Sequence, residues 1–455
     1  MLNLKQSIPW ISIIPLAAIA ASIGFALLQN RSNLPEMYQY KYTQNLERRA
    51  ETRSKAYARE IAFLQERVNR NPNDGLDLAG LAGAYIAKAR VSGQSAWYVL
   101  AEQAAERSLA ALPLAIGNVG AQLALAEIAQ AQHDFSRALK LIEAVTKAQP
   151  RNASALGLRS SIKLAQGDLE AALQDVEPLV KALPNQANLN LRAVILETQG
   201  KLEAAKKDFT HALEIEEADD AFGSARTRTL FARFAARHGQ PELAQGLLEE
   251  ALRIAPGYPL ALLQLADLKY RQGHYEQARA NYNELLSASK GSPSTFDHAA
   301  ILGLARIARA TNATDSNQLW NDAVKVLRKE VTGGAFGHRR ELARVLLERG
   351  NPQDVNEALR QAKLELDVRH DWESLNVLAW AQQRAGFLTK ARATIQKALV
   401  VGVQDAELEY RAGQIEQSLG NLEQAKVYFA SAEKIVPSSS REFERRFGFA
   451  TGDAK

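Results

Sequence analysis

A regular spacing between glycines constrains this chain more than any other feature. Gly239 and Gly273 are 34 residues apart, and Gly386 and Gly420 are also 34 residues apart. Each of these glycines follows a pair of apolar or small residues, and precedes a small residue by five positions and a large apolar residue by nine. Such periodicity indicates an array of similar units, each of which buries its apolar face against its neighbours.

The residues around each glycine predict two short helices joined by a turn. Ala278 and Tyr282 are four residues apart, so both lie on one face of a helix. The alanine allows two helices to cross closely, and the tyrosine fills the interface with the next unit. Gly273 closes the turn, where glycine adopts a left-handed backbone at the lowest cost. Other units carry equivalent residues: Ala205, Phe209, Ala391, Ala425 and Phe429.

This pattern resembles the tetratricopeptide repeat (TPR) family. The clearest copy contains Leu265, Ala266, Tyr270, Gly273, Tyr275, Ala278 and Tyr282. About ten such units are expected between Pro72 and Pro437, although the unit near residue 312 lacks its turn glycine and Gly350 is followed by an insertion-like Asn351-Pro352. The resemblance implies an all-α fold, a right-handed superhelical solenoid of about ten helix-turn-helix repeats, with a concave groove lined by the first helix of each pair.

An uncharged apolar run lies near the amino terminus, from Ile8 to Leu28. Its length matches the ~20 residues that a helix needs to cross a membrane. The alternative is a cleaved signal peptide with Lys5 at its charged start, which would leave a secreted soluble protein. The apolar core of a signal peptide is typically about 7–15 residues long, so this longer run favours one transmembrane helix ahead of the repeats.

The chain is therefore expected to divide into five segments. These are a short tail (1–7), a transmembrane anchor (8–28), a juxtamembrane helical stalk or cap (29–72), the TPR domain (73–437) and a carboxyl-terminal tail (438–455). Positive charges flank the anchor on both sides and do not decide its orientation. Because the chain has no cysteine, which suits an oxidising compartment, we expect a single-pass protein of the cell (inner) membrane with a periplasmic or exoplasmic body.

Composition and motifs exclude the common catalytic and metal-binding classes. Without cysteine there is no disulfide, thiolate zinc site, iron–sulfur cluster or cysteine nucleophile. No HExxH, GxxxxGK[ST] or GxSxG motif occurs. The seven histidines show no helical spacing that would build a metal-binding face. We therefore expect a non-enzymatic protein with no catalytic residues, no cofactor, no metal and no small-molecule substrate.

The net charge of +5 is modest, but arginines are concentrated in the middle units. In the TPR family fixed positions of the first helix line the groove, and the resemblance assigns the following residues to those positions: Arg226, Arg233, Arg237, Asp267, Tyr270, Arg271, Arg306, Arg309, Arg340, Arg344 and Trp380. Guanidinium groups form forked bonds to carboxylates and phosphates, so we expect an acidic segment of a partner to bind here, with Trp380 as an aromatic anchor. The alternative is that these arginines are solvated or paired with nearby glutamates.

These features predict a membrane-anchored TPR scaffold that binds other proteins in the assembly or organisation of a membrane or envelope complex. A second hypothesis is a regulatory adaptor with a cytoplasmic body that binds nucleic acid or an acidic membrane surface through the arginines. We do not expect nucleic acid as the main partner, because a periplasmic body would exclude it. An enzyme with an unrecognised site ranks last.

Overall fold

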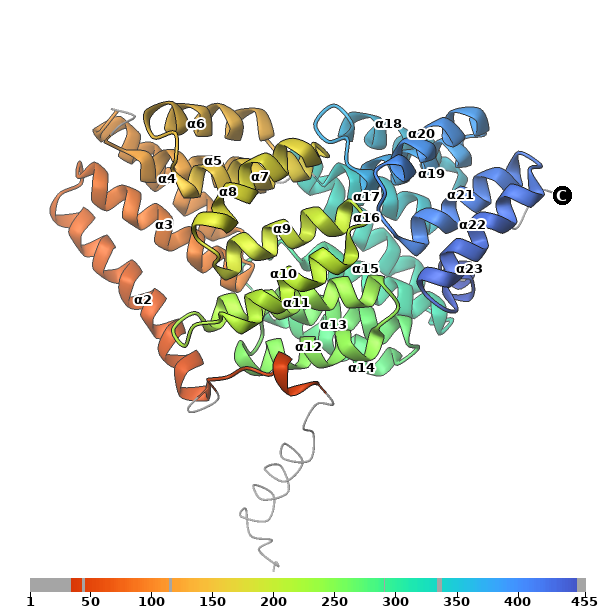
Figure 1. Ribbon diagram of the computed structural model, residues 1–455, viewed down its shortest axis with the longest axis horizontal. Coiled ribbons are helices and arrows are strands. Elements are labelled where there is room, and N and C mark those ends of the chain that lie inside the picture. Colours follow the sequence, from red (N-terminus) through yellow and green to blue (C-terminus); the bar gives the residue numbers. More distant parts are fainter. Residues whose placement is uncertain (1–33, 43–45, 114–116, 290, 334–337, 448–455) are drawn as a thin grey trace, which may run out of the picture.

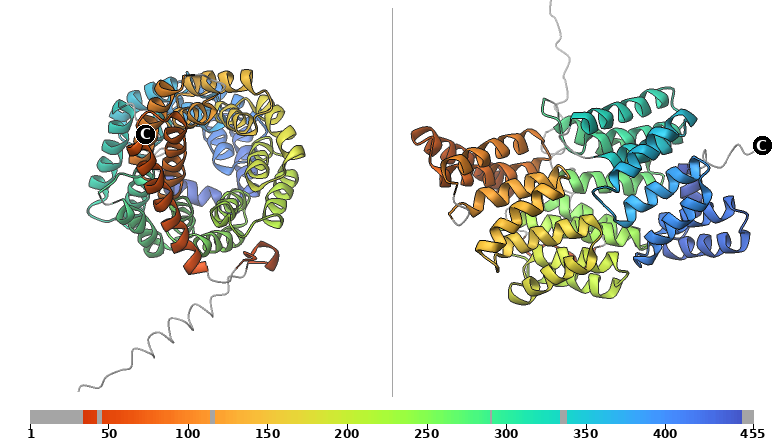
Figure 2. Two further views of the ribbon diagram at one scale, coloured as in Figure 1. Left: turned by 90° about the vertical axis from the view of Figure 1, so that its left-hand side faces the viewer. Right: turned by 90° about the horizontal axis from the view of Figure 1, so that it is seen from above.

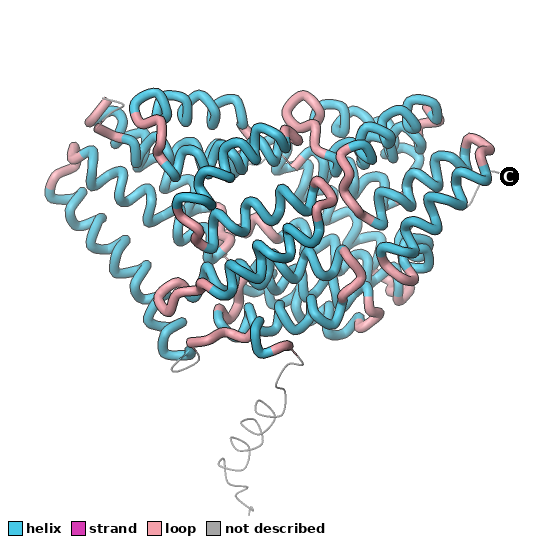
Figure 3. The backbone as a smooth tube through the Cα atoms, in the orientation of Figure 1, coloured by secondary structure: helices cyan, strands magenta, loops and turns pink. Residues whose placement is uncertain are grey.

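The computed structural model describes residues 34–42, 46–113, 117–289, 291–333 and 338–447. In these ranges the chain consists of helices joined by short loops (Figure 3). No strand occurs among the described residues, and a single isolated bridge joins Gln94 to Ser294. The expected all-helical repeat solenoid is therefore confirmed.

Ten consecutive helix pairs form the repeats within the described part of the chain (Figure 1). The pairs are α3 (Gly75–Ser92) and α4 (Ala96–Ala111), α5 (Val119–Ala131) and α6 (Phe135–Ala148), α7 (Ala153–Gln166) and α8 (Leu169–Ala182), α9 (Gln186–Thr198) and α10 (Leu202–Glu214), α11 (Ala221–Arg237) and α12 (Pro241–Ile254), α13 (Pro259–Arg271) and α14 (Tyr275–Ala288), α15 (Asp297–Ala310) and α16 (Ser316–Gly333), α17 (Arg339–Arg349) and α18 (Val355–Glu365), α19 (Trp372–Arg384) and α20 (Leu388–Val400), α21 (Ala406–Ser418) and α22 (Leu422–Ile435). A short 3-10 helix η2 (Pro352–Asp354) precedes α18 where the sequence shows its Asn-Pro insertion.

Local sequence signals start the helices. The side chains of Asp134, Asp168 and Asp220 accept hydrogen bonds from backbone N–H groups in the first turns of α6, α8 and α11. These N-caps satisfy donors that a helix cannot satisfy by itself. Gly273 adopts a φ of +79° in the turn between α13 and α14, as its recurrence in the sequence predicts.

The predicted packing residues lie at the helix interfaces. Ala205, Ala278 and Ala391 have no exposed surface, and neither do Phe209 and Tyr282. The fit is close between neighbouring repeats, because a Cβ atom placed on Gly303 would lie 2.1 Å from the Tyr282 ring. Large residues on one repeat therefore occupy space that small residues on the next repeat leave open.

The repeats wind into a superhelix whose successive turns touch. The helices surround a central axis when the molecule is viewed from its amino-terminal side (Figure 2). The internal turn of each of the first five repeats meets the junction that follows the repeat five places later, and we call this line of contacts the seam. Its five contacts are Gly93 with Ser294, His133 with His338, Gln166 with His370, Gly200 with Gly402, and Gly239 with Ile435.

Backbone hydrogen bonds hold parts of the seam together. Ser95 N donates to Pro293 O over 3.0 Å, and Thr295 N donates to Gly93 O over 2.9 Å. Further along the seam His370 N donates to Gln166 O over 3.0 Å. Residues about 200 positions apart are thus joined directly, which separates this solenoid from one whose repeats contact only their immediate neighbours.

Residues 34–42 and two additional helices complete the described structure. The segment that contains η1 (Glu36–Tyr38) packs against α10 and α12, where Leu34 and Tyr40 are buried. Helix α2 (Leu46–Arg70) packs on α3 at the start of the array. Helix α23 (Ser439–Phe447) follows the last repeat, in the segment expected to be a tail, and buries Phe443. Part of the expected stalk therefore belongs to the wall of the superhelix.

In the described ranges, no helix combines the length and the apolar character that crossing a membrane requires. The expected anchor at residues 8–28 lies outside those ranges.

Candidate functional site

The concave interior of the superhelix contains a cavity of about 720 Å³, which we call the interior cavity. Its wall is formed by the first helices of six consecutive repeats: α11, α13, α15, α17, α19 and α21. A smaller cavity of about 290 Å³ lies beside it, and Arg233, Arg237 and Arg340 line both. First helices therefore face the inside, as the TPR pattern implies.

Eight of the eleven residues that the sequence assigned to a groove line the interior cavity. They are Arg233, Arg237, Asp267, Tyr270, Arg271, Arg306, Arg340 and Arg344. Arg226, Arg309 and Trp380 do not line it. Spacing along the chain placed the eight residues on one surface because each belongs to a first helix, and first helices share one side of the solenoid.

Arg237 is surrounded by carboxylates from three other helices or helix junctions. Its guanidinium lies 2.7 Å from Glu373, 3.6 Å from Glu197 and 3.7 Å from Asp405. It also stacks over the Trp372 ring at 5.1 Å. Burial lowers the pKa of Arg237, but Glu197 and Glu373 outweigh this effect and leave the pKa raised. This guanidinium therefore ties α11 to α19 and to the start of α21.

Three other arginines of the cavity wall are also paired within the chain. Arg306 binds Glu348 through two hydrogen bonds of 2.6 and 2.8 Å, a forked geometry. Arg340 lies 2.9 Å from Glu373, and Arg344 Nη2 donates to Glu407 over 2.6 Å. The wall carries six arginines together with six carboxylates. The expectation of a strongly positive groove therefore needs correction, since internal pairing balances most of this charge.

The uncompensated positive charge is confined to fewer residues. Arg233 Nε is buried and has no hydrogen-bond partner among the described residues. Burial lowers the pKa of the Arg233 guanidinium, and the charge of Arg237 lowers it further. Arg271 is exposed and forms no ion pair within the described part of the chain. Arg226 is exposed as well, outside the interior cavity and in the electrostatic field of Arg90 and Glu127.

Two of the expected groove residues have structural roles instead. Trp380 is only 2% exposed and stacks with the Arg411 guanidinium at 3.9 Å, so it belongs to the core and cannot anchor a ligand. Arg309 stacks over the Trp320 ring at 3.8 Å and donates to Glu348 O over 2.8 Å. In both cases a residue of an adjacent helix covers the side chain that the repeat pattern alone leaves open.

Neutral polar groups of the wall are also available for binding. Gln264 Oε1 and Asn376 Oδ1 are buried and have no hydrogen-bond partner in the described part of the chain. Asp267 accepts a 2.5 Å hydrogen bond from Tyr282 and is therefore already engaged. Sequence reasoning did not select Gln264 or Asn376, because it weighted charge over neutral amides at the groove positions.

Comparisons with known proteins agree with this architecture. Family models described as "Tetratricopeptide repeat" match residues 123–187, 187–219 and 235–294. A solved structure, a human IFIT1 dimer with PPP-AAAA, is similar over 86% of this chain and 87% of that chain, at 16% sequence identity and a TM-score of 0.46. No curated protein matches the chain.

Proposed function

The chain is a tetratricopeptide-repeat protein, and we propose that it is an interaction scaffold whose interior cavity binds an acidic, extended segment of a partner protein. The observation that carries this proposal is the buried, unpartnered Nε of Arg233 on the cavity wall. A buried donor without an acceptor costs about 1–3 kcal/mol. A carboxylate of the ligand would accept from it and offset its burial.

The remaining features of the wall support an extended peptide as the ligand. Arg271 supplies a second cation, and Tyr270 lies next to it on the wall. Gln264 and Asn376 offer amide oxygens that can accept from a peptide backbone. The volume of about 720 Å³ falls in the range of about 300–1,000 Å³ that ligand pockets occupy, which suits a short segment and not a folded domain.

A binding assay with the full chain tests this proposal. Fluorescence anisotropy of a labelled glutamate-rich peptide would be compared for the wild type, the R233E/R271E variant, and a control variant K325E/K397E. Lys325 and Lys397 are exposed on the second helices α16 and α20, so the control changes the net charge by the same amount outside the cavity. We expect R233E/R271E to weaken binding about 10- to 100-fold, the effect of losing one charge-assisted hydrogen bond of about 1.5–3 kcal/mol. The control should change the affinity less than about twofold.

Two outcomes would contradict the proposal. Equal affinities of the wild type and R233E/R271E would place the peptide elsewhere. A single-stranded RNA oligonucleotide that binds more tightly and displaces the peptide in an Arg233-dependent way would identify a nucleic-acid ligand, because phosphates and carboxylates use the same guanidinium chemistry. Circular dichroism of each variant would establish that the helices remain folded.

We further propose that residues 8–28 tether this scaffold to a membrane, with the repeats outside the cytoplasm. The uncharged run from Ile8 to Leu28 supports the tether, and the absence of cysteine supports the location. Carboxyl-terminal fusions to alkaline phosphatase and to a cytoplasmic reporter test the orientation, and only the phosphatase fusion should be active. Recovery of the full chain in the soluble fraction would contradict the tether.

A further inference from the structure

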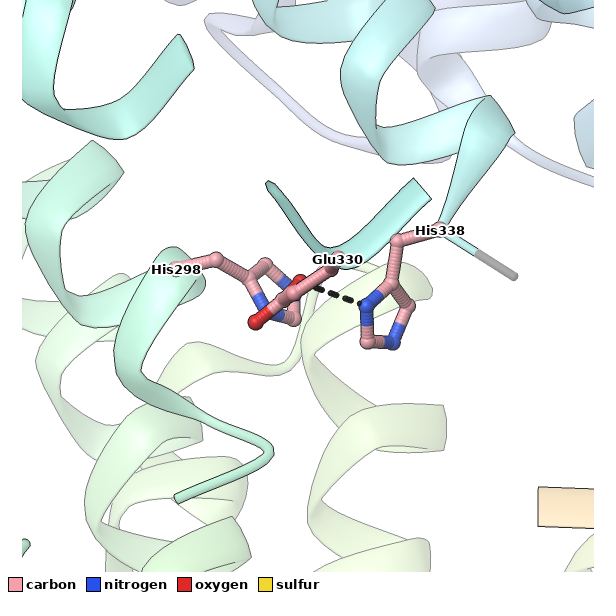
Figure 4. Close-up of side chains that lie close together, drawn as sticks. All are labelled: His298, Glu330 and His338. Carbon is pink, nitrogen blue, oxygen red and sulfur yellow. Dashed lines mark hydrogen bonds and ion pairs between the residues drawn. The ribbon is translucent and has the colours of Figure 1, made fainter. Parts of the chain in front are cut away.

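Two histidines and a glutamate from three helices converge beside the seam. His298 is the second residue of α15, Glu330 lies in the last turn of α16, and His338 is the N-cap of α17. One potential ligand atom from each residue lies within 4.8 Å of the other two. The Glu330 carboxylate is directed toward both imidazole rings (Figure 4). These residues are 32 and 8 positions apart, so no local motif marks them in the sequence.

Hydrogen bonding within the protein does not satisfy this cluster. His338 Nδ1 lies 2.8 Å from Glu330 Oε2, a normal hydrogen bond. His298 Nδ1 lies 3.7 Å from the same oxygen, too far for a hydrogen bond, and it is buried with no partner among the described residues. The two ring centroids are 4.5 Å apart. A ring nitrogen is thus buried and unused while it faces a carboxylate and a second imidazole.

The charges around the cluster favour a cation. Burial lowers the pKa of His298, and the nearby His338 lowers it further, which keeps its imidazole neutral. Neutral imidazole is the form that binds metals. The carboxylates of Glu341 and Asp297 also act on His298. The positive group on the far side of His338 is Arg369, whose Nη2 lies 2.6 Å from His133 Nδ1, so His133 is engaged by a guanidinium and is not counted as a ligand.

We propose that His298, Glu330 and His338 bind a divalent transition-metal ion of the zinc type, with one ring nitrogen from each histidine and one carboxylate oxygen. Two histidines and one carboxylate form a common three-ligand zinc set that leaves a fourth position open. Bonds of about 2.0–2.2 Å require ligand atoms about 3.4 Å apart in tetrahedral geometry. The spacings of 2.8 and 3.7 Å bracket this value, so small side-chain rotations suffice.

The position of the site gives the ion a structural role. Glu330 and His338 flank the junction between the seventh and eighth repeats, and His338 contacts His133 of the second repeat across the seam, with ring centroids 5.7 Å apart. An ion bound here would fix the start of α17 relative to α15 and α16. It would thereby hold the surface that contacts the second repeat. This role is independent of any ligand in the interior cavity.

The test uses the full chain after treatment with a chelator and then titration with zinc. Isothermal titration calorimetry and elemental analysis should give one ion per chain with a dissociation constant in the micromolar range or below. H298Q, E330Q and H338Q should each weaken binding at least tenfold. H274Q is the matched control, because His274 is an exposed histidine in the turn between α13 and α14 and should leave binding unchanged.

A second measurement does not depend on variants that fold. Diethyl pyrocarbonate modification of wild-type histidines, followed by peptide mass spectrometry, should slow at His298 and His338 when zinc is added and stay constant at His274. Cobalt(II) in place of zinc should give the intense visible absorption of a tetrahedral site. The proposal is overturned if zinc does not protect His298 and His338, or if the triple substitution binds zinc with wild-type stoichiometry and affinity.

Discussion

Arg228 donates a 2.8 Å hydrogen bond from Nη1 to Oε2 of Glu216, and neither side chain has any exposed surface. Both residues also bind the amino-terminal segment. Arg228 Nε donates to Tyr38 O over 2.9 Å, and Lys41 N donates to Glu216 Oε1 over 3.0 Å. One buried ion pair therefore attaches residues 38–41 to the junction between the fourth and fifth repeats.

Removal of one partner of this pair should destabilise the protein strongly. R228M leaves the Glu216 carboxylate buried and unpaired, which typically costs about 3–5 kcal/mol. We expect hydrogen exchange in α10 to α12 to accelerate by a factor consistent with that loss, and protease cleavage near Tyr38 to become faster. The double variant R228M/E216Q should recover part of the stability, because no charge then remains buried. Wild-type exchange rates in R228M would show that the pair contributes nothing.

Substitution of Gly200 should separate the seam from ordinary turn strain. G200A introduces a Cβ at a φ of +72° and places it 2.3 Å from Gly402 O, across the seam. Gly386 has a nearly identical φ of +78° but no atom within 4 Å of such a Cβ, so G386A is the matched control. The control should lose about 1–2 kcal/mol from the left-handed backbone alone. G200A should lose about 1–3 kcal/mol more in urea denaturation, the typical cost of overpacking. Equal losses would mean that the seam yields without cost.

The buried position of Trp380 predicts that its loss affects stability and not ligand binding. W380A removes a side chain that is 2% exposed and stacks on Arg411, and such truncations typically cost about 3–5 kcal/mol. Denaturation midpoints should fall accordingly. At a temperature where the variant stays folded, its affinity for the glutamate-rich peptide should equal that of the wild type. A selective loss of affinity with unchanged stability would restore Trp380 as a ligand contact.

Acidification should weaken the contacts around Glu373. Burial raises the pKa of this carboxyl, but the guanidinium groups of Arg340 and Arg237 outweigh burial and bring the pKa down to about 2. Since this value lies below the ordinary pKa of 4.5, the ionised form stabilises the fold above about pH 4.5, and the contribution is lost as the pH falls toward 2.

The variant E373Q makes this prediction measurable. Its melting temperature should lie below that of the wild type at pH 7, because Arg237 and Arg340 lose a shared carboxylate. The difference between the two proteins should shrink between pH 4.5 and pH 2. D367N, a substitution at a carboxylate between α18 and α19 and away from the interior cavity, serves as the control. A difference that stays constant over this range would contradict the assigned pKa.

Sequence and structure agree where packing is local. Small and large residues that contact one another, such as Ala278 and Tyr282 with Gly303, lie within about one repeat, so their periodicity predicts the helix pairs. The seam depends on the pitch of the whole superhelix, which accumulates from small rotations between repeats. No local pattern encodes that Gly200 meets Gly402. For the same reason the sequence placed Arg237 on the concave side but could not identify its partners Glu373 and Asp405.

The seam also has a mechanical consequence. A helical spring whose coils are separated by solvent stretches under small forces, because each joint bends slightly and none breaks. Here the coils touch at five places along the contour, from Gly93 on Ser294 to Gly239 on Ile435. Extension along the axis must therefore rupture discrete contacts before the joints can yield. A pull transmitted through this molecule would meet a stiff body with a rupture threshold, and not a compliant one.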